Sequence, residues 1–489
     1  MLLDLDLRGV LDRARELRLP AQAIINGQRV PARSGKSFDN ISPRDGTRLN
    51  EVCACDQADV DLAVASARRT FEQGDWRKEA PQTKKKVLFR LAELLESHAE
   101  ELALLESLDT GKPIADALNV DVSLAVRTTR WYAEALDKVY GEVGAAPDNR
   151  FSYAVHEPLG VIGAIVPWNF PLHMALWKVA PALAVGNSVV LKPAEQSPMT
   201  ALRLGELALE AGLPPGVLNV VPGLGETAGQ ALARHMDVDM IAFTGSGAVG
   251  RQLLVYSGQS NGKRVSLELG GKSPQIVFAD CPDLDRAAEA AFWGVFYNQG
   301  EVCTAASRLL VHERLKDALL DRLLKIAASV AVGDPLDPAT KFGAMVSEAQ
   351  LKRVLDYIAL ARREGAVLAL GGNQVRTDSG GYYVEPTIFD RVQSSSAIAR
   401  EEIFGPVLAV LSFTETEAAL RLANDTEFGL AAGLWTSNID LAHRAARELR
   451  AGLVWINGWD SCDITMPFGG FKQSGFGRDR SLHALHKYA

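Results

Sequence analysis

The chain has 489 residues, with 60 acidic and 52 basic side chains and a net charge of −8. This mildly acidic balance argues against a nucleic-acid binder, because phosphate contacts need a basic surface. Hydrophobic residues make up 47% and charged residues 23%, as in ordinary globular proteins, which excludes a disordered or collagen-like chain. The length predicts roughly two to four domains.

Five cysteines are too few, and odd in number, for a disulfide framework, so we expect a reducing, cytoplasmic environment. Residues 1–20 lack the basic and then apolar order of a signal peptide. From Pro158 to Trp177 no Lys, Arg, Asp or Glu occurs, but Pro167 and Pro171 interrupt the stretch. A buried strand, a loop and a helix start therefore explain it better than a membrane span.

The predicted elements alternate along most of the chain. Leucines at helical spacing predict helices over 60–109. Short apolar runs predict strands at 160–166, 188–191, 218–221, 240–243 and 265–269, with helices starting near 172, 199, 226 and 247. A second series has a strand at 274–278, helices near 283–297, 313–330, 347–364 and 416–424, and possible strands at 307–311 and 453–457. The pattern predicts mainly parallel sheets covered on both faces, with ligands at the carboxyl ends of the strands.

Two glycine-rich turns, 222–229 and 243–250, each join a predicted strand to a predicted helix. A helix N-terminus there suits a phosphate, although the spacing is not G-x-G-x-x-G and a tight structural turn fits equally well. Two such turns on neighbouring strands favour a dinucleotide. The segment 270–273 (GGKS) resembles the end of a P-loop, but Ser266 stands where that motif needs glycine, which excludes a nucleotide triphosphatase.

Cys303 lies in a polar, glycine-containing break between a helical run and an apolar strand. A thiol on such a loop is accessible, and at a pKa of ~8.5 it is partly thiolate near neutrality; a buried small hydrophobe is the alternative. Histidines show no triad-like setting, so a base would be a carboxylate. Glu268 ends an apolar strand beside glycines, where partial burial would raise its pKa; a solvated acid is the alternative. Cys53 and Cys55 lack partners at zinc spacing, so no metal site is expected.

Seven segments in order along the chain resemble the aldehyde dehydrogenase superfamily, and the likeness extends over about residues 20–485. They are PWNFP (167–171), KPAE (192–195), FTGS…G (243–250), LELGGKSP (267–274), NQGEVC (298–303), EEIFGP (401–406) and PFGGFKQSG (467–475). The resemblance implies an α/β fold with three parts. These are a Rossmann-like, parallel-sheet NAD-binding domain (1–138 and 160–269), an α/β catalytic domain (270–473) and a small bridging or oligomerisation element (139–159 and 474–489).

The resemblance also implies NAD-dependent oxidation of an aldehyde to a carboxylic acid through a thiohemiacetal and a thioester. Cys303 is then the nucleophile, and the Asn169 amide and the Cys303 backbone N–H stabilise the oxyanion. Glu268 activates the water that hydrolyses the thioester, and Lys178 assists proton movement. Family members without this glutamate transfer the acyl group to coenzyme A, so Glu268 favours release of a free acid.

Lys192 and Glu195 resemble the pair that contacts the adenine ribose, and a carboxylate there repels a 2′-phosphate, so NAD is expected rather than NADP. The other cofactor contacts implied are Val166, Trp168, Gly225, Gly229, Phe243, Gly245, Ser246, Glu402 and Phe404. The implied aldehyde tunnel comprises Phe170, Met174, Trp177, Tyr297, Trp459 and Phe468. Its aromatic walls exclude water and can face a cationic amino group.

Segments 130–143, 279–291 and 481–489 resemble bacterial γ-glutamyl-γ-aminobutyraldehyde and related aminoaldehyde dehydrogenases of polyamine breakdown. Asp121, Glu301 and Asp460 can favour a distal cation, but each is explained as readily as a structural or solvated acid. The alternatives are a betaine or aliphatic aldehyde dehydrogenase, a coenzyme-A-acylating semialdehyde dehydrogenase, a simple esterase and a non-catalytic structural protein.

We expect no nucleic-acid or membrane partner, and a homodimer or homotetramer formed through the hairpin near 139–159. Family chains usually continue past the position of Ala489 into a strand that pairs with a neighbouring subunit. This sequence ends before that strand, which weakens the expectation of an oligomer.

Overall fold

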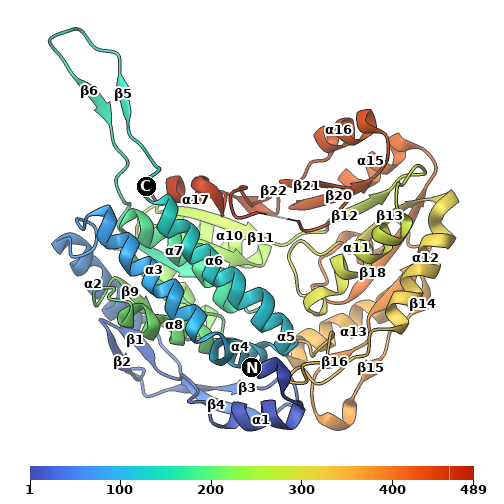
Figure 1. The fold of residues 1–489 in the computed structure, drawn as a ribbon, viewed down its shortest axis with the longest axis horizontal. Helices are drawn as coiled ribbons and strands as arrows, with labels where there is room; N and C mark the ends of the chain where they lie inside the picture. The colour runs from blue at the N-terminus through green and yellow to red at the C-terminus, as the bar shows by residue number, and fades with distance from the viewer. Residues whose placement is uncertain (462) are drawn as a thin grey trace.

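The computed structural model describes residues 1–461 and 463–489, and it forms two α/β lobes with a projecting hairpin (Figure 1). The first lobe contains an eight-stranded sheet in the order β2-β1-β9-β8-β7-β10-β11-β23, whose central strands β9 to β11 run parallel. Its strands are β1 (Ala23–Ile25), β2 (Gln28–Val30), β7 (Val161–Ile165), β8 (Ser188–Lys192), β9 (Leu218–Val220), β10 (Met240–Gly245), β11 (Arg264–Leu269) and β23 (Gly475–Phe476).

Alternating side chains of this sheet enter two separate cores. Ile162 and Val189 pack with the helices of one face, whereas Val161 and Val190 pack with those of the other. The helices of the first face are α3 (Pro81–Ser97), α4 (Ala99–Thr110), α6 (Ser123–Ala135), α7 (Pro171–Val185) and α8 (Met199–Glu210). Those of the second face are α2 (Gln57–Gln73), α9 (Gln230–Arg234) and α10 (Gly247–Gly258). Burial on both faces explains why the strands read as continuous apolar runs.

The second lobe holds a seven-stranded sheet in the order β14-β17-β18-β13-β12-β20-β21, in which only the edge strand β14 pairs antiparallel. Its strands are β12 (Pro274–Val277), β13 (Arg308–His312), β14 (Val367–Leu370), β17 (Thr387–Asp390), β18 (Val407–Phe413), β20 (Ala431–Trp435) and β21 (Leu453–Ile456). Its helices are α11 (Leu284–Phe296), α12 (Glu313–Ala328), α13 (Glu348–Arg363), α14 (Ala397–Arg400), α15 (Thr416–Asn424) and α16 (Ile439–Glu448).

The predicted α/β class with parallel sheets is confirmed. Strands β17, β18 and β20 were not predicted from the sequence, because a short buried apolar run has no period that separates strand from helix. Smaller elements complete the chain: η1 (Leu2–Asp4), α1 (Leu7–Arg15), β3 (Ser37–Ile41), β4 (Arg48–Cys53), α5 (Ile114–Asp116), η2 (Ala117–Val122), η3 (Gly225–Gly229), η4 (Tyr297–Gly300), β15 (Gln374–Val375), η5 (Thr377–Ser379), β16 (Tyr383–Val384), β19 (Phe428–Gly429) and β22 (Phe471–Lys472). None of the described helices is long and apolar enough to cross a membrane.

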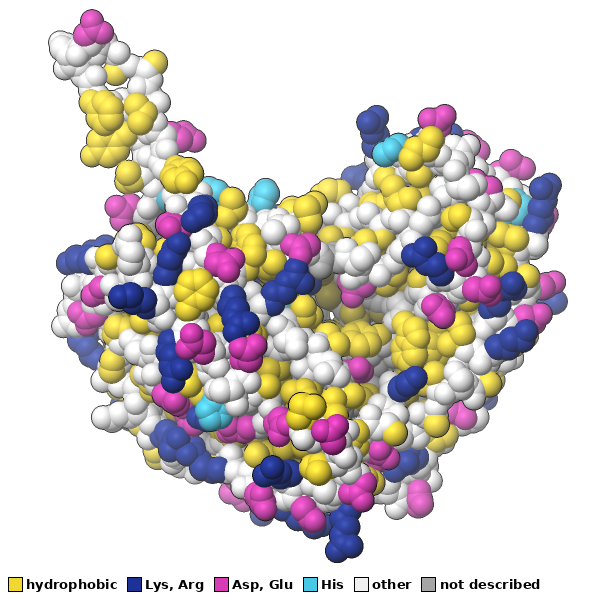
Figure 2. Space-filling view, viewed as in Figure 1, with side chains coloured by type: hydrophobic (Ala, Val, Ile, Leu, Met, Phe, Trp, Pro, Cys, Tyr) yellow, Lys and Arg dark blue, Asp and Glu magenta, His cyan; other side chains and the backbone are white. Residues whose placement is uncertain are grey.

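The hairpin of β5 (Glu142–Gly144) and β6 (Ser152–Ala154) projects from the first lobe, and its side chains form an apolar patch (Figures 1 and 2). Tyr140, Val143 and Phe151 are all more than two-thirds exposed. A two-stranded ribbon is marginal alone in water, and exposed apolar patches of this kind mark contact surfaces.

The C-terminal segment packs against the first lobe. β23 pairs antiparallel with β11, and α17 (Ser481–Lys487) packs on α7. Within residues 474–489, predicted to belong with the hairpin, β23 therefore extends the first sheet, although the backbone N–H of Leu159 donates to the carbonyl of Tyr488 at 3.2 Å. The proposed division into domains stays a prediction.

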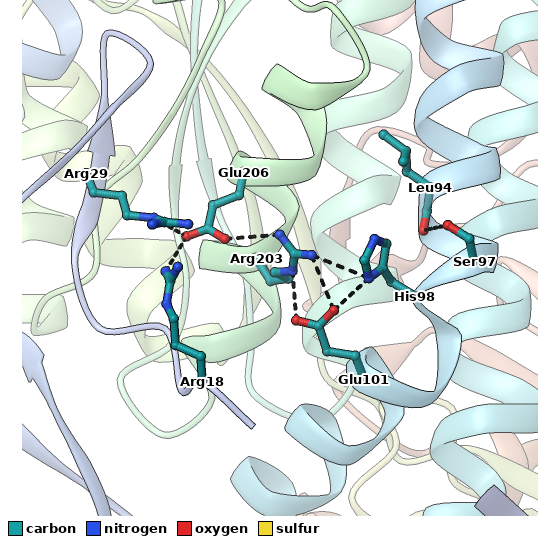
Figure 3. A network of polar contacts seen from close by, with 8 residues as sticks. All are labelled: Arg18, Arg29, Leu94, Ser97, His98, Glu101, Arg203 and Glu206. Carbon is teal, nitrogen blue, oxygen red and sulfur yellow. Dashed lines mark hydrogen bonds and ion pairs between the residues drawn. The ribbon is translucent and has the colours of Figure 1, made fainter. Parts of the chain in front are cut away.

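A polar network joins the N-terminal segment to α4 and α8 (Figure 3). Glu206 accepts from Arg18 at 2.8 Å and also pairs with Arg29, while Arg203 joins Glu206 to Glu101. Single surface ion pairs contribute about 0–1 kcal/mol, but shared partners make a network firmer. It holds the first residues of the chain against the helices that pack over the sheet.

Candidate active site

A cavity of about 700 Å³ is lined by residues of both lobes. Trp168 and Asn169 follow β7, Glu268 lies at the end of β11, and Cys303 and Glu402 belong to loops of the second lobe. The carboxyl ends of parallel strands meet at one edge of the first sheet, which is where such folds bind ligands.

The loop before Cys303 turns sharply after α11. Asn298, Gln299 and Gly300 have φ angles of +47°, +55° and +75°, so three consecutive residues are left-handed. A Cβ on Gly300 would meet the backbone of Gly405 at 2.3 Å, so only glycine fits there. Such backbone strain persists where the surrounding structure fixes it, and here it directs Cys303 into the cavity.

Asn169 is tied to this loop across the lobes. Its Nδ2 donates to the carbonyl of Glu301 at 2.7 Å, and Asn298 Nδ2 donates to the carbonyl of Asn169 at 3.2 Å. A primary amide carries two N–H groups, and this contact uses one of them. The second N–H is available to an oxygen bound in the cavity beside Cys303.

Glu268 is 3% exposed, and burial raises the pKa of its carboxyl to about 8, with the charge of Asp479 adding to the rise. Lys178, Lys487 and Arg478 oppose this shift. Glu268 Oε1 accepts no hydrogen bond from the described residues. The carboxyl is therefore mostly protonated at neutral pH and becomes a base as the pH approaches 8.

Burial also raises the pKa of the Cys303 thiol well above its usual range, and the nearby carboxylates of Glu268 and Glu402 raise it further. Lys178 does not line the cavity: it is fully buried and donates to Asp479, which also accepts from Lys487. Lys178 therefore acts on Glu268 by its charge, from behind the cavity wall.

The opposite end of the cavity starts at the N-terminus of α10. Gly245 and Ser246 line it, and Ser246 Oγ caps the helix by accepting from the N–H of Val249 at 3.4 Å. Glu402 Oε1 accepts from the N–H of Gly271 at 3.0 Å, and a Cβ on Gly270 would lie 1.9 Å from the Glu402 carboxylate.

These groups fit a dinucleotide. Free N–H groups at a helix start suit a pyrophosphate, and a carboxylate pinned beside two glycines suits a ribose diol. Phe404 has a left-handed backbone, with φ +60°. Its ring meets that of Trp168 edge-on, with the ring centroids 5.2 Å apart, and the two rings form one wall of the cavity. Lys192, the last residue of β8, pairs with Glu195 at 2.9 Å.

The remaining residues predicted to contact the cofactor lie outside the cavity lining. The backbone N–H of Val166 donates to the carbonyl of Lys192 at 3.2 Å. Phe243 lies two residues before Gly245 in β10, so both face the same side of the sheet. A Cβ on Gly245 would lie 2.4 Å from Cζ of the Phe243 ring. Gly225 and Gly229 bound η3, after β9, and a Cβ on either would meet nothing within 4 Å.

Five of the six residues predicted for the aldehyde tunnel line the cavity: Phe170, Met174, Trp177, Tyr297 and Phe468. Trp459 is not among the lining residues, and its ring centroid lies 4.8 Å from that of Trp455. The lining also includes Val120, Leu124, His173, Asp460 and Arg480.

The three acids considered for a distal cation have different surroundings. Asp121 is fully buried and paired with Lys112, and buried Glu301 accepts from the N–H of Val346 at 3.1 Å. Asp460 opens onto the cavity. Arg480 was not predicted as a site residue, because no spacing rule connects it to the aromatic residues that it contacts.

Known proteins similar to this chain agree with the site described above, a cleft for a dinucleotide with the Cys303 thiol at one end. Residues 30–489 match the model of the aldehyde dehydrogenase family, so the chain belongs to that family. The structure superposes on an indole-3-acetaldehyde dehydrogenase solved with NAD⁺, with a TM-score of 0.98 and 55% identity over 99% of this chain and 98% of that one. The protein is an NAD-dependent aldehyde dehydrogenase.

Two further relatives have specific names. The NADP/NAD-dependent aldehyde dehydrogenase PuuC of Escherichia coli is 51% identical over 98% of this chain and 96% of its own length. A γ-glutamyl-γ-aminobutyraldehyde dehydrogenase of Burkholderia cenocepacia has a TM-score of 0.97 and 54% identity over 99% of this chain and 98% of that one. The resemblance to this group of enzymes is confirmed.

Replacing Gly270 by alanine is expected to weaken NAD binding by about tenfold or more, because the new methyl group would displace the Glu402 carboxylate. The Kd is measured by quenching of protein fluorescence. Gly258→Ala is the matched control, since a Cβ there meets nothing within 4 Å. Equal Kd values for the two variants would show that Glu402 does not hold the dinucleotide.

Proposed function

We propose that this enzyme oxidises an aminoaldehyde of polyamine breakdown, such as γ-glutamyl-γ-aminobutyraldehyde or guanidinobutyraldehyde, to the free acid. The observation that carries the proposal is one cavity that holds Cys303, Asn169 and Glu268 and continues between aromatic walls. The names of the Escherichia coli and Burkholderia cenocepacia relatives support the substrate class.

In the proposed mechanism the Cys303 thiol releases its proton to water in the cavity, and the thiolate Sγ forms a bond to the aldehyde carbon. The second C–O bond of the carbonyl breaks at the same time, so the carbonyl oxygen becomes an oxyanion. The free N–H of Asn169 and the backbone N–H of Cys303 donate to that oxygen. Donors fixed in advance stabilise the charge without reorganising, and removing one such donor typically costs about 10²–10³ in rate. The contact of Asn169 with the Glu301 carbonyl is what holds the amide in place.

A bound NAD would supply the acceptor for the hydride of the thiohemiacetal carbon, and loss of that hydride would leave a thioester on Cys303. Within this chain, Glu402, Ser246 and Trp168 would hold the dinucleotide along the cleft. Phe170, Trp177 and Phe468 would orient the aldehyde and exclude water from the reacting carbon.

Glu268 is proposed to take a proton from the water that attacks the thioester. The carbon–sulfur bond then breaks, and the acid and the Cys303 thiolate separate. Only the ionised carboxylate can accept a proton, so the pKa of about 8 places this step under pH control near neutrality. Lys178 and Asp479 would tune the carboxyl from behind the wall.

Glu195 supports a preference for NAD. Its carboxylate lies at the surface end of the pair with Lys192, where it can accept from both ribose hydroxyls and repel a 2′-phosphate.

The apolar hairpin supports a homodimer or homotetramer. Four free cysteines among the described residues support a reducing, cytoplasmic location.

We also propose a division into an NAD-binding part, a catalytic part and a bridging hairpin. Residues 474–489 are grouped with the first lobe, which the pairing of β23 with β11 supports.

Cys303→Ala is expected to abolish NADH formation, because no other described residue of the cavity lining supplies a nucleophilic sulfur. NAD should still bind with an unchanged Kd, which shows that the cleft is intact. NADH absorbance with hexanal measures turnover, and dehydrogenase activity that persists in this variant would exclude Cys303 as the nucleophile.

Thioester hydrolysis is expected to accelerate as the pH rises through about 8, since Glu268 must lose its proton to act as a base. Stopped-flow measurement of the NADH burst and of the later steady state separates the two steps. Glu268→Gln should keep a burst near one NADH per site and lose the steady state about 100-fold. Equal loss of both phases would contradict the assigned role.

Glu195→Gln is expected to lower the ratio of kcat/KM for NAD over NADP by about tenfold, because a neutral amide no longer repels a 2′-phosphate. Glu72→Gln, at an exposed acid of α2, is the matched control for charge. Addition of coenzyme A, with a search for acyl-coenzyme A, tests the acyl-transfer alternative.

A further inference from the structure

Arg480 brings an unneutralised positive charge to the aromatic wall of the cavity. Its guanidinium carbon lies 4.5 Å from the ring centroid of Trp177 and 4.9 Å from that of Phe468. Among the described residues no carboxylate pairs with it and no atom accepts a hydrogen bond from its side chain. Guanidinium has five N–H donors, so the rings satisfy one face and leave the donors at its edge unused.

The position of Arg480 is fixed by the backbone around it. Phe468 and Asp479 exchange both backbone hydrogen bonds at 2.8 Å, and the N–H of Ser481 donates to the carbonyl of Ile464 at 2.8 Å. Arg480 itself has φ +59°, a sparsely populated region for a side chain of this size. Strain held between two anchors is typical of positions where a side chain must face a particular way.

Asp460 is the second charged group in this part of the cavity. It too is left-handed, at φ +53°. Asp460 is exposed in the free protein, but the protein atoms around it raise the pKa of its carboxyl, and the positive charge of Arg480 opposes that rise. Asp460 and Arg480 do not form an ion pair, which leaves both charges open to a ligand between them.

The other charges nearby do not complement Arg480. Lys112 is fully buried with Glu106 and Asp121, and its Nζ lies over the Phe170 ring at 4.2 Å. His173 accepts from Trp177 Nε1 at 2.7 Å, and burial together with Arg480 and Lys112 holds the pKa of His173 well below its usual range. The imidazole is therefore neutral.

From this arrangement we propose that Arg480 is a specificity-determining residue that binds a carboxylate on the distal end of the aldehyde, while Asp460 receives an ammonium group beside it. The cavity would then select an aldehyde whose tail ends in an α-amino acid. The proposal deepens the proposed function and rests on it. A tail with only a cation is repelled by Arg480, whereas an amino-acid tail presents one charge of each sign to the two residues.

A γ-glutamyl group has these two charges, since it ends in an α-carboxylate and an α-ammonium. Charge-assisted hydrogen bonds from a guanidinium to a carboxylate are directional and are frequently bidentate. In a cavity with aromatic walls they are screened less than in water. Guanidinobutyraldehyde, whose tail is only cationic, is therefore the poorer substrate of the two candidates.

The test compares kcat/KM for aldehydes that differ in tail charge. The panel is hexanal, a series of ω-oxo carboxylates of increasing chain length, guanidinobutyraldehyde and γ-glutamyl-γ-aminobutyraldehyde. Arg480→Met should lower kcat/KM for the γ-glutamyl substrate by about 10- to 100-fold relative to hexanal, mainly through KM. The ω-oxo acid that is long enough to reach Arg480 should lose a similar factor.

Asp460→Asn should lower kcat/KM for the γ-glutamyl substrate relative to that for hexanal. The kcat/KM values for the ω-oxo acids should stay the same or rise, because these substrates carry no ammonium group. Arg480→Glu should reverse the preference toward guanidinobutyraldehyde. Arg127→Met, which removes an exposed arginine paired with Asp463, controls for a general change in the electric field. Arg480→Lys should restore part of the preference, since the charge remains and the bidentate geometry is lost.

Loss of the same factor for hexanal and for the carboxylates in Arg480→Met would assign Arg480 to packing and overturn the inference. So would a wild-type enzyme that favours guanidinobutyraldehyde over the γ-glutamyl compound. The proposed function fails differently: if the wild-type enzyme oxidises hexanal and the ω-oxo acids but no aminoaldehyde, the substrate class is wrong, while the ratio of ω-oxo acid to hexanal still tests Arg480.

Discussion

The hydrogen bond from the Asn169 amide to the Glu301 carbonyl connects the two lobes at the reacting centre. Asn169 follows a strand of the first sheet, and Glu301 belongs to the strained loop of the second lobe that carries Cys303. Asn298 returns a contact to the carbonyl of Asn169. The nucleophile and the oxyanion donor therefore keep their relative position only while the lobes stay packed, which is why neither lobe by itself contains an active site.

Burial is the second constraint, and it sets the protonation states. Cys303 and Glu268 both lie in a low-dielectric setting that favours their neutral forms. The cluster of Lys178, Asp479 and Lys487 lies behind Glu268, and its cations and its anion act on the carboxyl in opposite directions. Because the C-terminal helix α17 supplies Lys487, the last residues of the chain contribute to the chemistry at the end of β11.

The aldehyde end of the cavity combines apolar walls with two opposite charges. Aromatic rings alone would accept many aldehydes, because contacts with apolar chains discriminate by only about 1–3 kcal/mol per methylene. Charged groups discriminate more strongly, because a bound substrate removes them from water. A substrate that leaves them unpaired offers no hydrogen bond or ion pair to offset that desolvation free energy. Arg480 and Asp460 would thus decide which aldehydes are used, while Cys303, Asn169 and Glu268 decide what happens to all of them.

The sequence by itself determined the class of fold, the family and the residues around the thiol. Apolar runs that alternate with helical patterns follow from burial on both faces of a parallel sheet. PWNFP follows β7 and LELGGKSP includes the end of β11, at the edge of the first sheet where ligands bind, and NQGEVC forms the loop of the second lobe that carries Cys303. Tertiary structure alone decided the rest. Lys178 turned out to act from behind the wall and Trp459 to lie outside the lining, whereas Arg480 entered the cavity through a strained turn. The orientation of a side chain on a residue with positive φ, such as Arg480, depends on backbone contacts with distant residues, here Ile464 and Phe468, and no local pattern encodes them.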